Sequence, residues 1–311
     1  MKTILLVNMG GPSDTNEIRG YLKAIFSDSA ILPLPGLIRK PLARYISGKR
    51  EPKVAARYDM IGGGSPLRAW TEKLRNLVAD ELKNPRGNLG VVHAFRYSSP
   101  TIETAINDLN PAKIDEIILL PLFPHRTNAM TGSIEKEAAR VCERRNIRLK
   151  SIPSWGNRED IISIWHDYIR EEMKKTDGDC FVLFVAHGIP LRNVNRGDDY
   201  PERVRETVKA LGERLPSNAG WSLAFQSRVG PVKWTAPYLE NEILRISKIS
   251  KNLLMMPVSF VSDCLETLYD LDIVAVKTAH NAGIERVRRI RVFNDDPRFA
   301  RELAAIVSEV I

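Results

Sequence analysis

The segment VLFVAHGIP, residues 182–190, decides the fold. Its first five residues are apolar, which is typical of a strand that is buried on both faces of a parallel sheet. A histidine, His187, follows where this strand is expected to end, and Gly188 and Pro190 then predict a turn. Ligands of open α/β sheets bind beyond the carboxyl ends of the strands. His187 therefore occupies a position where a functional side chain is expected, although a single histidine at a strand end also suits a structural role.

Similar apolar runs recur along the whole chain. They cover residues 3–7, 89–95, 116–120, 181–185, 222–225 and 252–256. Helical periodicity covers the segments between them, at residues 66–82, 102–109, 133–144, 161–174, 200–215 and 238–247. Strands that alternate with helices form parallel sheets with helices on both faces. We therefore predict a doubly wound α/β protein.

Three short matches indicate that the two halves of the chain are alike. ILLVNMGGP (4–12) lines up with residues 182–190, AFRYSSP (94–100) with AFQSRVGP (224–231), and IILLP (117–121) with LLMMP (253–257). The matches follow one another in the same order, as they do in internal repeats. This order predicts two similar α/β domains that face each other, with the boundary near residue 150.

The composition is that of an ordinary globular protein. The 311 residues, 43% of them hydrophobic and 27% charged, allow about two domains of roughly 150 residues each. No stretch approaches the roughly 20 apolar residues of a membrane span, and no secretory cleavage site follows the first strand, so we expect a cytoplasmic protein. Cys142, Cys180 and Cys264 are too widely separated for a Cys-x-x-Cys metal site or a disulfide framework.

The charge of the chain indicates an acidic partner. Its formal net charge is +8 and its pI is about 9.4, which suits a nucleic acid, an anionic membrane or a polyanionic small molecule. The sequence lacks a compact basic stripe and an aromatic RNA-binding motif. We therefore expect no nucleic-acid partner.

Acidic residues gather in PVSFVSDCLETLYDLDI, residues 257–273. On a helix that begins near Asp263, Glu266 lies one turn along and shares a face with Asp270. Asp263 and Glu266 fit a capping box, which is a purely structural interpretation. Alternatively, Glu266 faces His187. An imidazole and a carboxylate would then form a site for a divalent transition metal with open coordination positions.

In combination, these motifs resemble those of the ferrochelatase family, whose members insert ferrous iron into a porphyrin at the end of haem synthesis. The resemblance runs from residue 3 to about residue 306. It rests on LVNMGGP, KREPKV, RYDMIGGGSP, AFRYSSPTIE, LPLFPHRTNAMTGS, VAHGIPLRNVNRGDDYP, FQSRVGPVKWTAP and FVSDCLETLYDLDI.

The resemblance implies a fold and a site. It implies Rossmann-like domains at residues 1–150 and 151–295, with a C-terminal helix (about 296–311) that returns to the first domain. His187 and Glu266 become the catalytic and metal-binding pair. Fe²⁺ is then a substrate, and no tightly bound cofactor is expected. We expect no iron–sulfur cluster, because the chain carries no cysteine-bearing C-terminal extension.

Metal insertion requires proton transfer and an exposed ring. A neutral His187 can accept a pyrrole proton or bind the metal, while Glu266 supplies negative charge and a proton exit that Asp270 and Asp272 can extend. A flat macrocycle keeps its nitrogen lone pairs in its own plane. Binding it in a distorted shape exposes them, at a strain of about 1 to 5 kcal/mol.

A porphyrin also needs an apolar wall and cations for its propionates. The candidate wall residues are Met9, Ile25, Leu32, Leu34, Tyr58, Tyr97 and Trp234. The candidate cations are Lys49, Arg50 and Arg96. Two of these residues also suit structural roles, Trp234 as a core aromatic and Arg96 as an ion-pair partner at a strand end.

The segment 31–50 mixes Leu, Ile and Pro with Arg and Lys. It is expected either to form an apolar lip that makes peripheral contact with an anionic membrane, or to be a surface loop with a packed helix. The glycines of residues 62–64 lack the spacing of a phosphate loop, so they predict a tight turn before a helix that starts near Pro66.

The chain departs from the family at two places. Cys264 stands where a histidine usually follows the aspartate, so proton relay there is in doubt. Cys264 is either a small apolar filler or a thiolate that favours softer metals. His125 and Arg126 stand where a glutamine and an aromatic residue are common, which is expected to add positive charge.

Several alternatives stay open at this point. The porphyrin is either protoporphyrin IX or coproporphyrin III. A non-catalytic tetrapyrrole carrier would keep the aromatic wall without needing His187 and Glu266 together. A cobalt chelatase would act on a sirohydrochlorin-like ring, which carries many more carboxylates.

Overall fold

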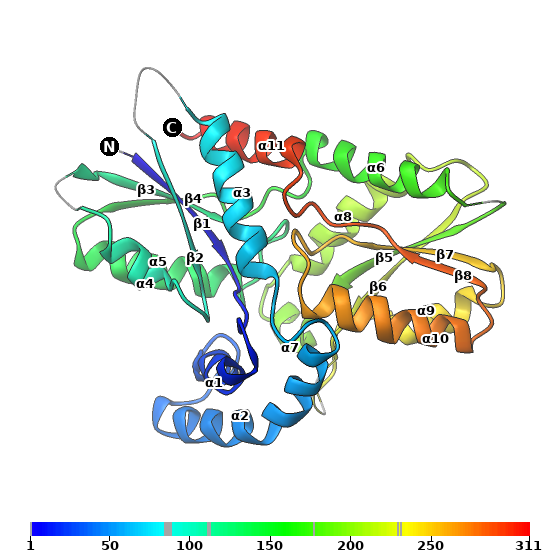
Figure 1. The fold of residues 1–311 in the computed structure, drawn as a ribbon, viewed down its shortest axis with the longest axis horizontal. Helices are drawn as coiled ribbons and strands as arrows, with labels where there is room; N and C mark the ends of the chain where they lie inside the picture. Colours follow the sequence, from blue (N-terminus) through cyan, green and yellow to red (C-terminus); the bar gives the residue numbers. More distant parts are fainter. Residues whose placement is uncertain (1, 84–88, 111–112, 177, 229, 231) are drawn as a thin grey trace. The chain divides into compact units, whose positions relative to one another are not determined.

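The computed structural model describes residues 2–83, 89–110, 113–176, 178–228, 230 and 232–311 (Figure 1). The chain divides into two compact units. Unit 1 consists of Met1–Ser154 together with Asn294–Ile311, and unit 2 consists of Trp155–Phe293. Each unit has its own four-stranded sheet.

The sheet of unit 1 is entirely parallel, with the strand order β2-β1-β3-β4. Its strands are β1 (Lys2–Asn8), β2 (Gly90–Phe95), β3 (Glu116–Pro121) and β4 (Arg148–Ser151). Side chains alternate between the faces of a strand, so Leu5 and Val7 share one face. They pack there against α4 (Ile102–Asn107) and α5 (Thr131–Arg144).

The C-terminal helix completes unit 1. Helix α11 (Pro297–Ser308) packs against α3 (Leu67–Glu81), on the side of the sheet opposite α4 and α5 (Figure 1). Lys2 and Lys150 donate hydrogen bonds from their Nζ atoms to the last two carbonyls of the chain, at 2.5 and 2.7 Å. The predicted return of the C-terminal helix to the first α/β unit is therefore confirmed.

Two further helices follow β1 in unit 1. A short 3₁₀ turn, η1 (Thr15–Glu17), leads into α1 (Ile18–Ser27), which packs against the long helix α2 (Gly36–Asp59). Most of the segment 31–50 is therefore helical. A turn with positive φ at Gly62 and Gly63 joins α2 to α3, as the sequence predicts.

Unit 2 repeats the topology of unit 1, with the parallel strand order β6-β5-β7-β8. Its strands are β5 (Phe181–His187), β6 (Gly220–Gln226), β7 (Asn252–Pro257) and β8 (Arg286–Arg289). Leu183 and Val185 face α9 (Leu239–Ile246), the π-helix η3 (Glu266–Ala275) and α10 (Val276–Asn281). Helices α6 (Glu159–Met173) and α8 (Tyr200–Gly212) cover the other face, and the short α7 (Leu191–Val194) follows β5 (Figure 1).

The predicted internal repeat is confirmed strand by strand. The matched segments are β1 and β5, β2 and β6, and β3 and β7, which occupy the same places in the two sheets. In both units a phenylalanine N–H then donates to a proline carbonyl at 2.8 Å, from Phe95 to Pro100 and from Phe225 to Pro237. The intervening loop is longer in unit 2, and it carries Trp234.

Some elements escaped prediction for physical reasons. β4 (RLKS) and β8 (RVRR) are short, charged edge strands, so they lack the apolar run that marks a buried strand. The helix expected to begin near Asp263 begins at Leu265 and is π-helical from Glu266 onwards. Among the described residues, no helix is both long and apolar enough to cross a membrane.

The packing of α11 yields a prediction. Leu303 is fully buried, so Leu303→Ala should reduce the free energy of unfolding of unit 1 by about 2 to 5 kcal/mol, as large-to-small core substitutions do. Denaturant unfolding measures this loss. The matched control, Arg301→Ala, removes a side chain that is 65% exposed and should change stability by less than about 0.5 kcal/mol. Equal effects of the two substitutions would contradict the role of α11 in the core.

Candidate active site

His187 is held firmly at the carboxyl end of β5. Its N–H donates to Ser259 Oγ at 2.8 Å, and its carbonyl accepts from Tyr200 Oη at 2.9 Å. Its ring makes an edge contact with Phe260, at 6.3 Å between centroids. Strand alternation places His187 on the same face as Leu183 and Val185. That face is the one that η3 covers.

Glu266 lies on a different element, η3, which covers the same face of the sheet as His187. It is the first residue of η3 and is half-buried, while Leu271 and Ala275 further along η3 pack on the core face of the sheet. Burial lowers the pKa of His187, and the negative charge of Glu266 acts in the opposite direction. The two side chains therefore interact electrostatically, and the imidazole is neutral at pH 7. The structure brings together the two residues that the sequence paired.

A partly buried arginine, Arg289, holds the segment that carries Glu266. Arg289 of β8 contacts Asp263 at 3.0 Å and Asp272 at 2.7 Å. Asp263 also accepts a hydrogen bond from the Thr267 hydroxyl at 3.0 Å. Asp263 precedes Glu266 in the chain and Asp272 follows it. By binding both, Arg289 holds the π-helical backbone around Glu266 in place. π-helical turns occur frequently at functional sites.

Cys264 lies beside Glu266. The thiol is within hydrogen-bonding reach of the Glu266 carboxylate, and burial, followed by the charge of Glu266, raises the pKa of the thiol well above its usual value. Cys264 is thus a protonated thiol. This state favours the interpretation of Cys264 as a small buried side chain over that of a free thiolate.

Trp234 packs on the turn that follows His187. Pro190 and Trp234 form an antiparallel bridge, and the Ile189 N–H donates to Thr235 Oγ1 at 3.1 Å. A Cβ atom on Gly188 would lie 2.8 Å from the Gln226 carbonyl oxygen and 3.5 Å from the Trp234 ring. Only glycine fits between them without displacement. The half-buried indole is thereby fixed one residue beyond the histidine.

Among the described residues, the acidic and sulfur-containing side chains form no larger metal cluster. In the part of the chain that the structure describes, no three or more His, Cys, Asp or Glu side chains are arranged to hold a metal ion. An ion bound by only two side chains, such as one imidazole and one carboxylate, keeps open coordination positions. Sites that exchange or transfer an ion need such positions.

The remaining predicted porphyrin residues belong to unit 1. Met9 follows β1, and Ile25, Leu32, Leu34, Lys49 and Arg50 lie on or between α1 and α2. Tyr58 and Tyr97 are 3% and 6% exposed. Met9 and Tyr97 are joined by a backbone hydrogen bond of 3.0 Å.

Asp28 organises a buried polar cluster that the sequence did not reveal. Its carboxylate accepts hydrogen bonds from Arg96 at 2.8 Å, from the Tyr97 hydroxyl at 2.9 Å and from Ser133. Burial alone would raise the pKa of Asp28, but the hydrogen bonds from Ser133 and Ala30 and the charge of Arg96 outweigh it and lower that pKa. Arg96 is therefore an ion-pair partner at a strand end, which was the structural alternative to binding a propionate.

His125 and Arg126 supply less positive charge than their types suggest. His125 is 2% exposed, and burial lowers its pKa to about 3. It is therefore neutral at pH 7, and the expectation that it adds positive charge is wrong. Arg126 pairs with Glu135 at 3.1 Å and donates to Asn128 at 2.8 Å.

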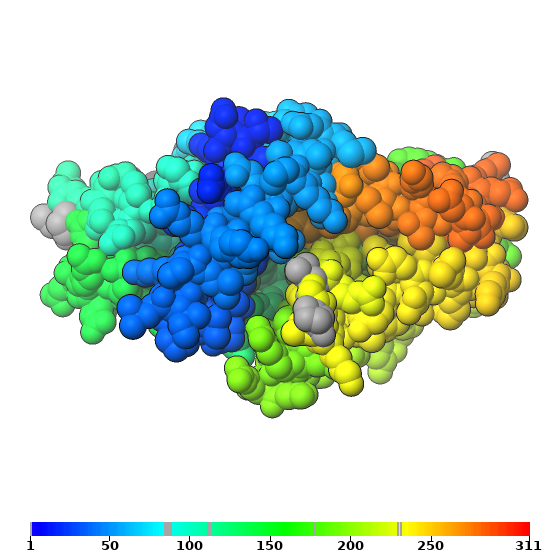
Figure 2. All heavy atoms as spheres, turned by 90° about the horizontal axis from the view of Figure 1, so that it is seen from below, coloured from blue at the N-terminus to red at the C-terminus, as the bar shows by residue number. Residues whose placement is uncertain are grey.

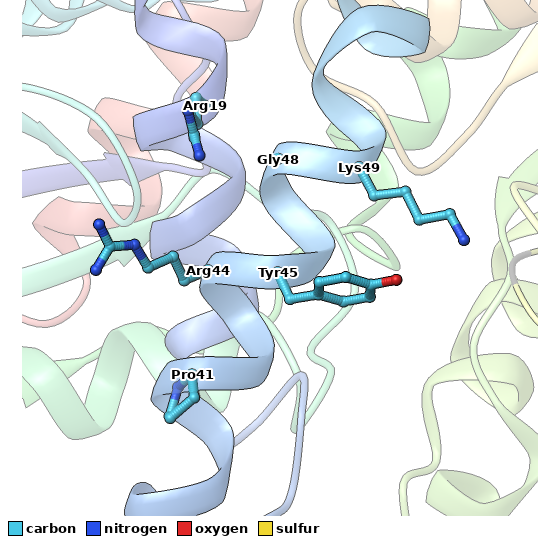
Figure 3. Close-up of a pocket in the computed structure, with 6 residues that line it drawn as sticks. All are labelled: Arg19, Pro41, Arg44, Tyr45, Gly48 and Lys49. Atoms are coloured by element: carbon cyan, nitrogen blue, oxygen red, sulfur yellow. The ribbon is translucent and has the colours of Figure 1, made fainter.

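A surface hollow of about 540 Å³ lies on the helices of unit 1 (Figure 3). Arg19 reaches it from α1, and Tyr45 and Lys49 project from the same side of α2. The hollow combines cationic and apolar groups. It includes Lys49, one of the two predicted propionate cations on α2.

The burial of His125 makes stability depend on pH. In the unfolded chain the histidine titrates near 6.5, whereas in the folded chain it titrates at about 3. The unfolded state thus binds an extra proton between these values, so stability should fall as the pH decreases through this window, by up to about 1.4 kcal/mol per pH unit.

His125→Gln tests this dependence. Because glutamine does not titrate, the variant should lose this part of the pH dependence, and its free energy of unfolding relative to wild type should rise steadily from pH 6.5 to pH 4. Denaturant titrations at a series of pH values measure the difference. A difference that stays constant with pH would contradict the burial of a neutral His125.

Comparison with known proteins identifies the family. The ferrochelatase family model matches residues 1–311. A ferrochelatase of Desulfotalea psychrophila is 35% identical and aligns over 98% of this chain and 96% of its own length. A ferrochelatase of Thermosynechococcus vestitus is 36% identical, over 99% of this chain and 82% of the relative. The mitochondrial ferrochelatase of Xenopus laevis is 33% identical, over 98% and 77%.

Solved structures support the same fold at low sequence identity. SirB from Bacillus subtilis with Fe³⁺ superposes with a TM-score of 0.59 at 14% identity, covering 99% of this chain and 94% of SirB. CbiX, described as the terminal enzyme of sirohaem biosynthesis in denitrifying bacteria, superposes with a TM-score of 0.55 at 15% identity, covering 99% of both chains. The chain thus has a chelatase-like fold with two parallel sheets. On the full-length family match and the identity of its relatives, the chain belongs to the ferrochelatase family of lyases.

Proposed function

We propose that this ferrochelatase inserts Fe²⁺ into protoporphyrin IX, with His187 and Glu266 holding the ion and receiving the two pyrrole protons. One observation carries the proposal. A desolvated, neutral imidazole and a carboxylate interact at the carboxyl end of β5. The strand order of the sheet reverses beside β5, and α/β sheets bind their ligands at such points.

The reaction exchanges one ion for two protons. The ring loses its two N–H protons and becomes a dianion, and its four nitrogens then bind Fe²⁺, so the ring core remains neutral overall. A neutral imidazole can accept a proton directly, and its lowered pKa allows it to release that proton again. Glu266 compensates the positive charge that builds up while the ion and the departing protons are both near the site.

Release of the protons is assigned to Asp270 rather than to Asp272. Asp270 is a half-buried residue of η3, four positions after Glu266. Asp272 is committed to Arg289 through two hydrogen bonds, at 2.7 and 2.9 Å. Both oxygens of its carboxylate are thus occupied by the guanidinium, so its role is structural.

Rigid apolar residues are proposed to distort the porphyrin. Trp234 is the contact assigned to unit 2, since its indole is braced against the turn at Gly188. The contacts assigned to unit 1 are Met9, Ile25, Leu32, Leu34, Tyr58 and Tyr97. Lys49 and Arg50 are proposed as the main cations for the propionates, because the guanidinium of Arg96 is already paired with Asp28 at 2.8 Å.

Peripheral membrane contact is proposed for the segment 31–50. Leu37, Ile38 and Tyr45 are 92%, 56% and 66% exposed, next to basic side chains of the same helix. Figure 2 shows α1 and α2, in blue, at the surface of unit 1. An exposed mixture of apolar and basic residues suits an anionic bilayer surface.

Replacing the histidine tests the assignment. His187→Ala should abolish metal insertion while porphyrin affinity is largely kept, because the imidazole acts on the ion and on protons rather than on the bulk of the ring. Insertion is followed by the absorption change under anaerobic conditions, and affinity by fluorescence quenching. The matched control His280→Ala removes an exposed imidazole whose Nδ1 is hydrogen-bonded to the Ile284 carbonyl at 3.0 Å, so it should keep near-wild-type turnover.

The same assay decides among the alternatives. Supplied with Fe²⁺, the wild-type chain should metallate protoporphyrin IX faster than coproporphyrin III. The reverse order would assign it to coproporphyrin III. Binding of either ring without metal insertion would make the chain a tetrapyrrole carrier, and His187→Ala would then have no effect.

A further inference from the structure

Gln226 is the residue next to His187 across the sheet of unit 2. It is the last residue of β6 and pairs in register with His187 of β5. Partners in a parallel ladder project their side chains from the same face. The alternation along β6 agrees, because Ala224 belongs to the same core cluster as Leu183 and Val185. The amide of Gln226 therefore neighbours the imidazole, on the face where Glu266 begins η3.

This amide is buried without a hydrogen bond. Gln226 is 5% exposed, and neither Nε2 nor Oε1 has a hydrogen-bond partner among the residues that the structure describes. An unsatisfied buried polar group costs about 1 to 3 kcal/mol. Since an apolar residue of similar size would avoid that cost, folding alone does not account for an amide here.

The internal repeat provides a comparison within the same chain. The position of Gln226 in unit 2 corresponds to that of Arg96 in unit 1, because both directly follow the matched Ala-Phe pairs. Arg96 is satisfied by Asp28 at 2.8 Å and Ser133 at 2.7 Å. The same framework thus supplies partners for a polar side chain in unit 1 but none in unit 2. The partner of Gln226 is expected to be a ligand.

We propose that Gln226 is a third ligand of the divalent ion held by His187 and Glu266, binding it through the carbonyl oxygen Oε1. This inference rests on the proposed function and adds a residue to its ion site. A carboxamide oxygen is a neutral donor that suits divalent first-row ions. Because it adds neither charge nor a titrating proton, it can orient the ion without competing for the pyrrole protons.

The proposal is tested with Co²⁺ alone, without porphyrin, on the full-length chain. Titration followed by the visible absorption of bound Co²⁺ gives the affinity. Gln226→Leu should bind Co²⁺ about 10- to 100-fold more weakly than wild type, the range seen when groups that support a metal site are removed. Gln226→Glu supplies a carboxylate oxygen at the same place, so it should bind Co²⁺ at least as tightly as wild type.

The control replaces an amide at the amino end of a strand in the same sheet, away from the carboxyl ends where His187 and Gln226 lie. Asn252 begins β7, and its Nδ2 donates to the Asp179 carbonyl at 2.9 Å. Asn252→Leu should leave the Co²⁺ affinity unchanged. Thermal unfolding checks the fold, and Gln226→Leu should be at least as stable as wild type, because it removes unsatisfied polar groups. If Gln226→Leu does not fold, Gln226→Met, which keeps the shape of the side chain, replaces it in the titration.

The outcomes separate this inference from the proposed function. Weaker binding in Gln226→Leu with retained binding in Gln226→Glu supports the amide as a ligand. If His187→Ala loses Co²⁺ but Gln226→Leu binds it as wild type does, the role of Gln226 is overturned and the proposed function stands. If His187→Ala binds Co²⁺ as wild type does, the ion site itself is wrong, and both proposals fall.

Discussion

The interaction between a desolvated imidazole and a carboxylate is the constraint on which the site depends. His187 loses water because it ends a strand that is buried on both faces, and this burial keeps it neutral. Glu266 offsets part of that effect because a loop and a π-helix return the chain to the same edge of the sheet. Each residue would be unremarkable elsewhere. A parallel sheet, by aligning the carboxyl ends of its strands, makes their meeting possible.

The surroundings of this pair are built to resist movement. The backbone of His187 is held at both its N–H and its carbonyl, the turn after it admits only glycine, and Arg289 holds the helix opposite. Groups that must meet an ion within a few tenths of an ångström need such support, because catalytic geometry is lost more easily than binding. Gln226, in register with His187, is a buried group that the described residues leave without a hydrogen bond.

Much of the fold could be predicted from the sequence because its inner strands are buried on both faces and are therefore continuous apolar runs. The inner strands β1, β3, β5 and β7 are continuous apolar runs, and the repeat revealed the shared topology. The edge strands β4 and β8 carry charges on arginine and lysine, so composition hid them. The sequence paired His187 with Glu266 through their motifs, but the separation of two motifs along the chain does not give their distance in space. The structure shows that the two side chains are close enough to interact electrostatically.

Other features of the site depend on tertiary contacts that no local pattern encodes. Asp28 was not singled out in the sequence, although it gathers Arg96, Tyr97 and Ser133 from distant positions. His125 reads as a potential cation until burial is known. The π-helix likewise follows from packing and from the hold of Arg289, since nothing in ETLYDLDIVA distinguishes it from an α-helix.

The discontinuity of unit 1 has a consequence for biosynthesis. A ribosome synthesises residues in order, so the whole chain of unit 2 is made before α11, which unit 1 requires. The first sheet to be synthesised is thus the last to acquire its full cover of helices. Until α11 has been synthesised and released, the apolar side of α3 that awaits it is open to chaperones and proteases.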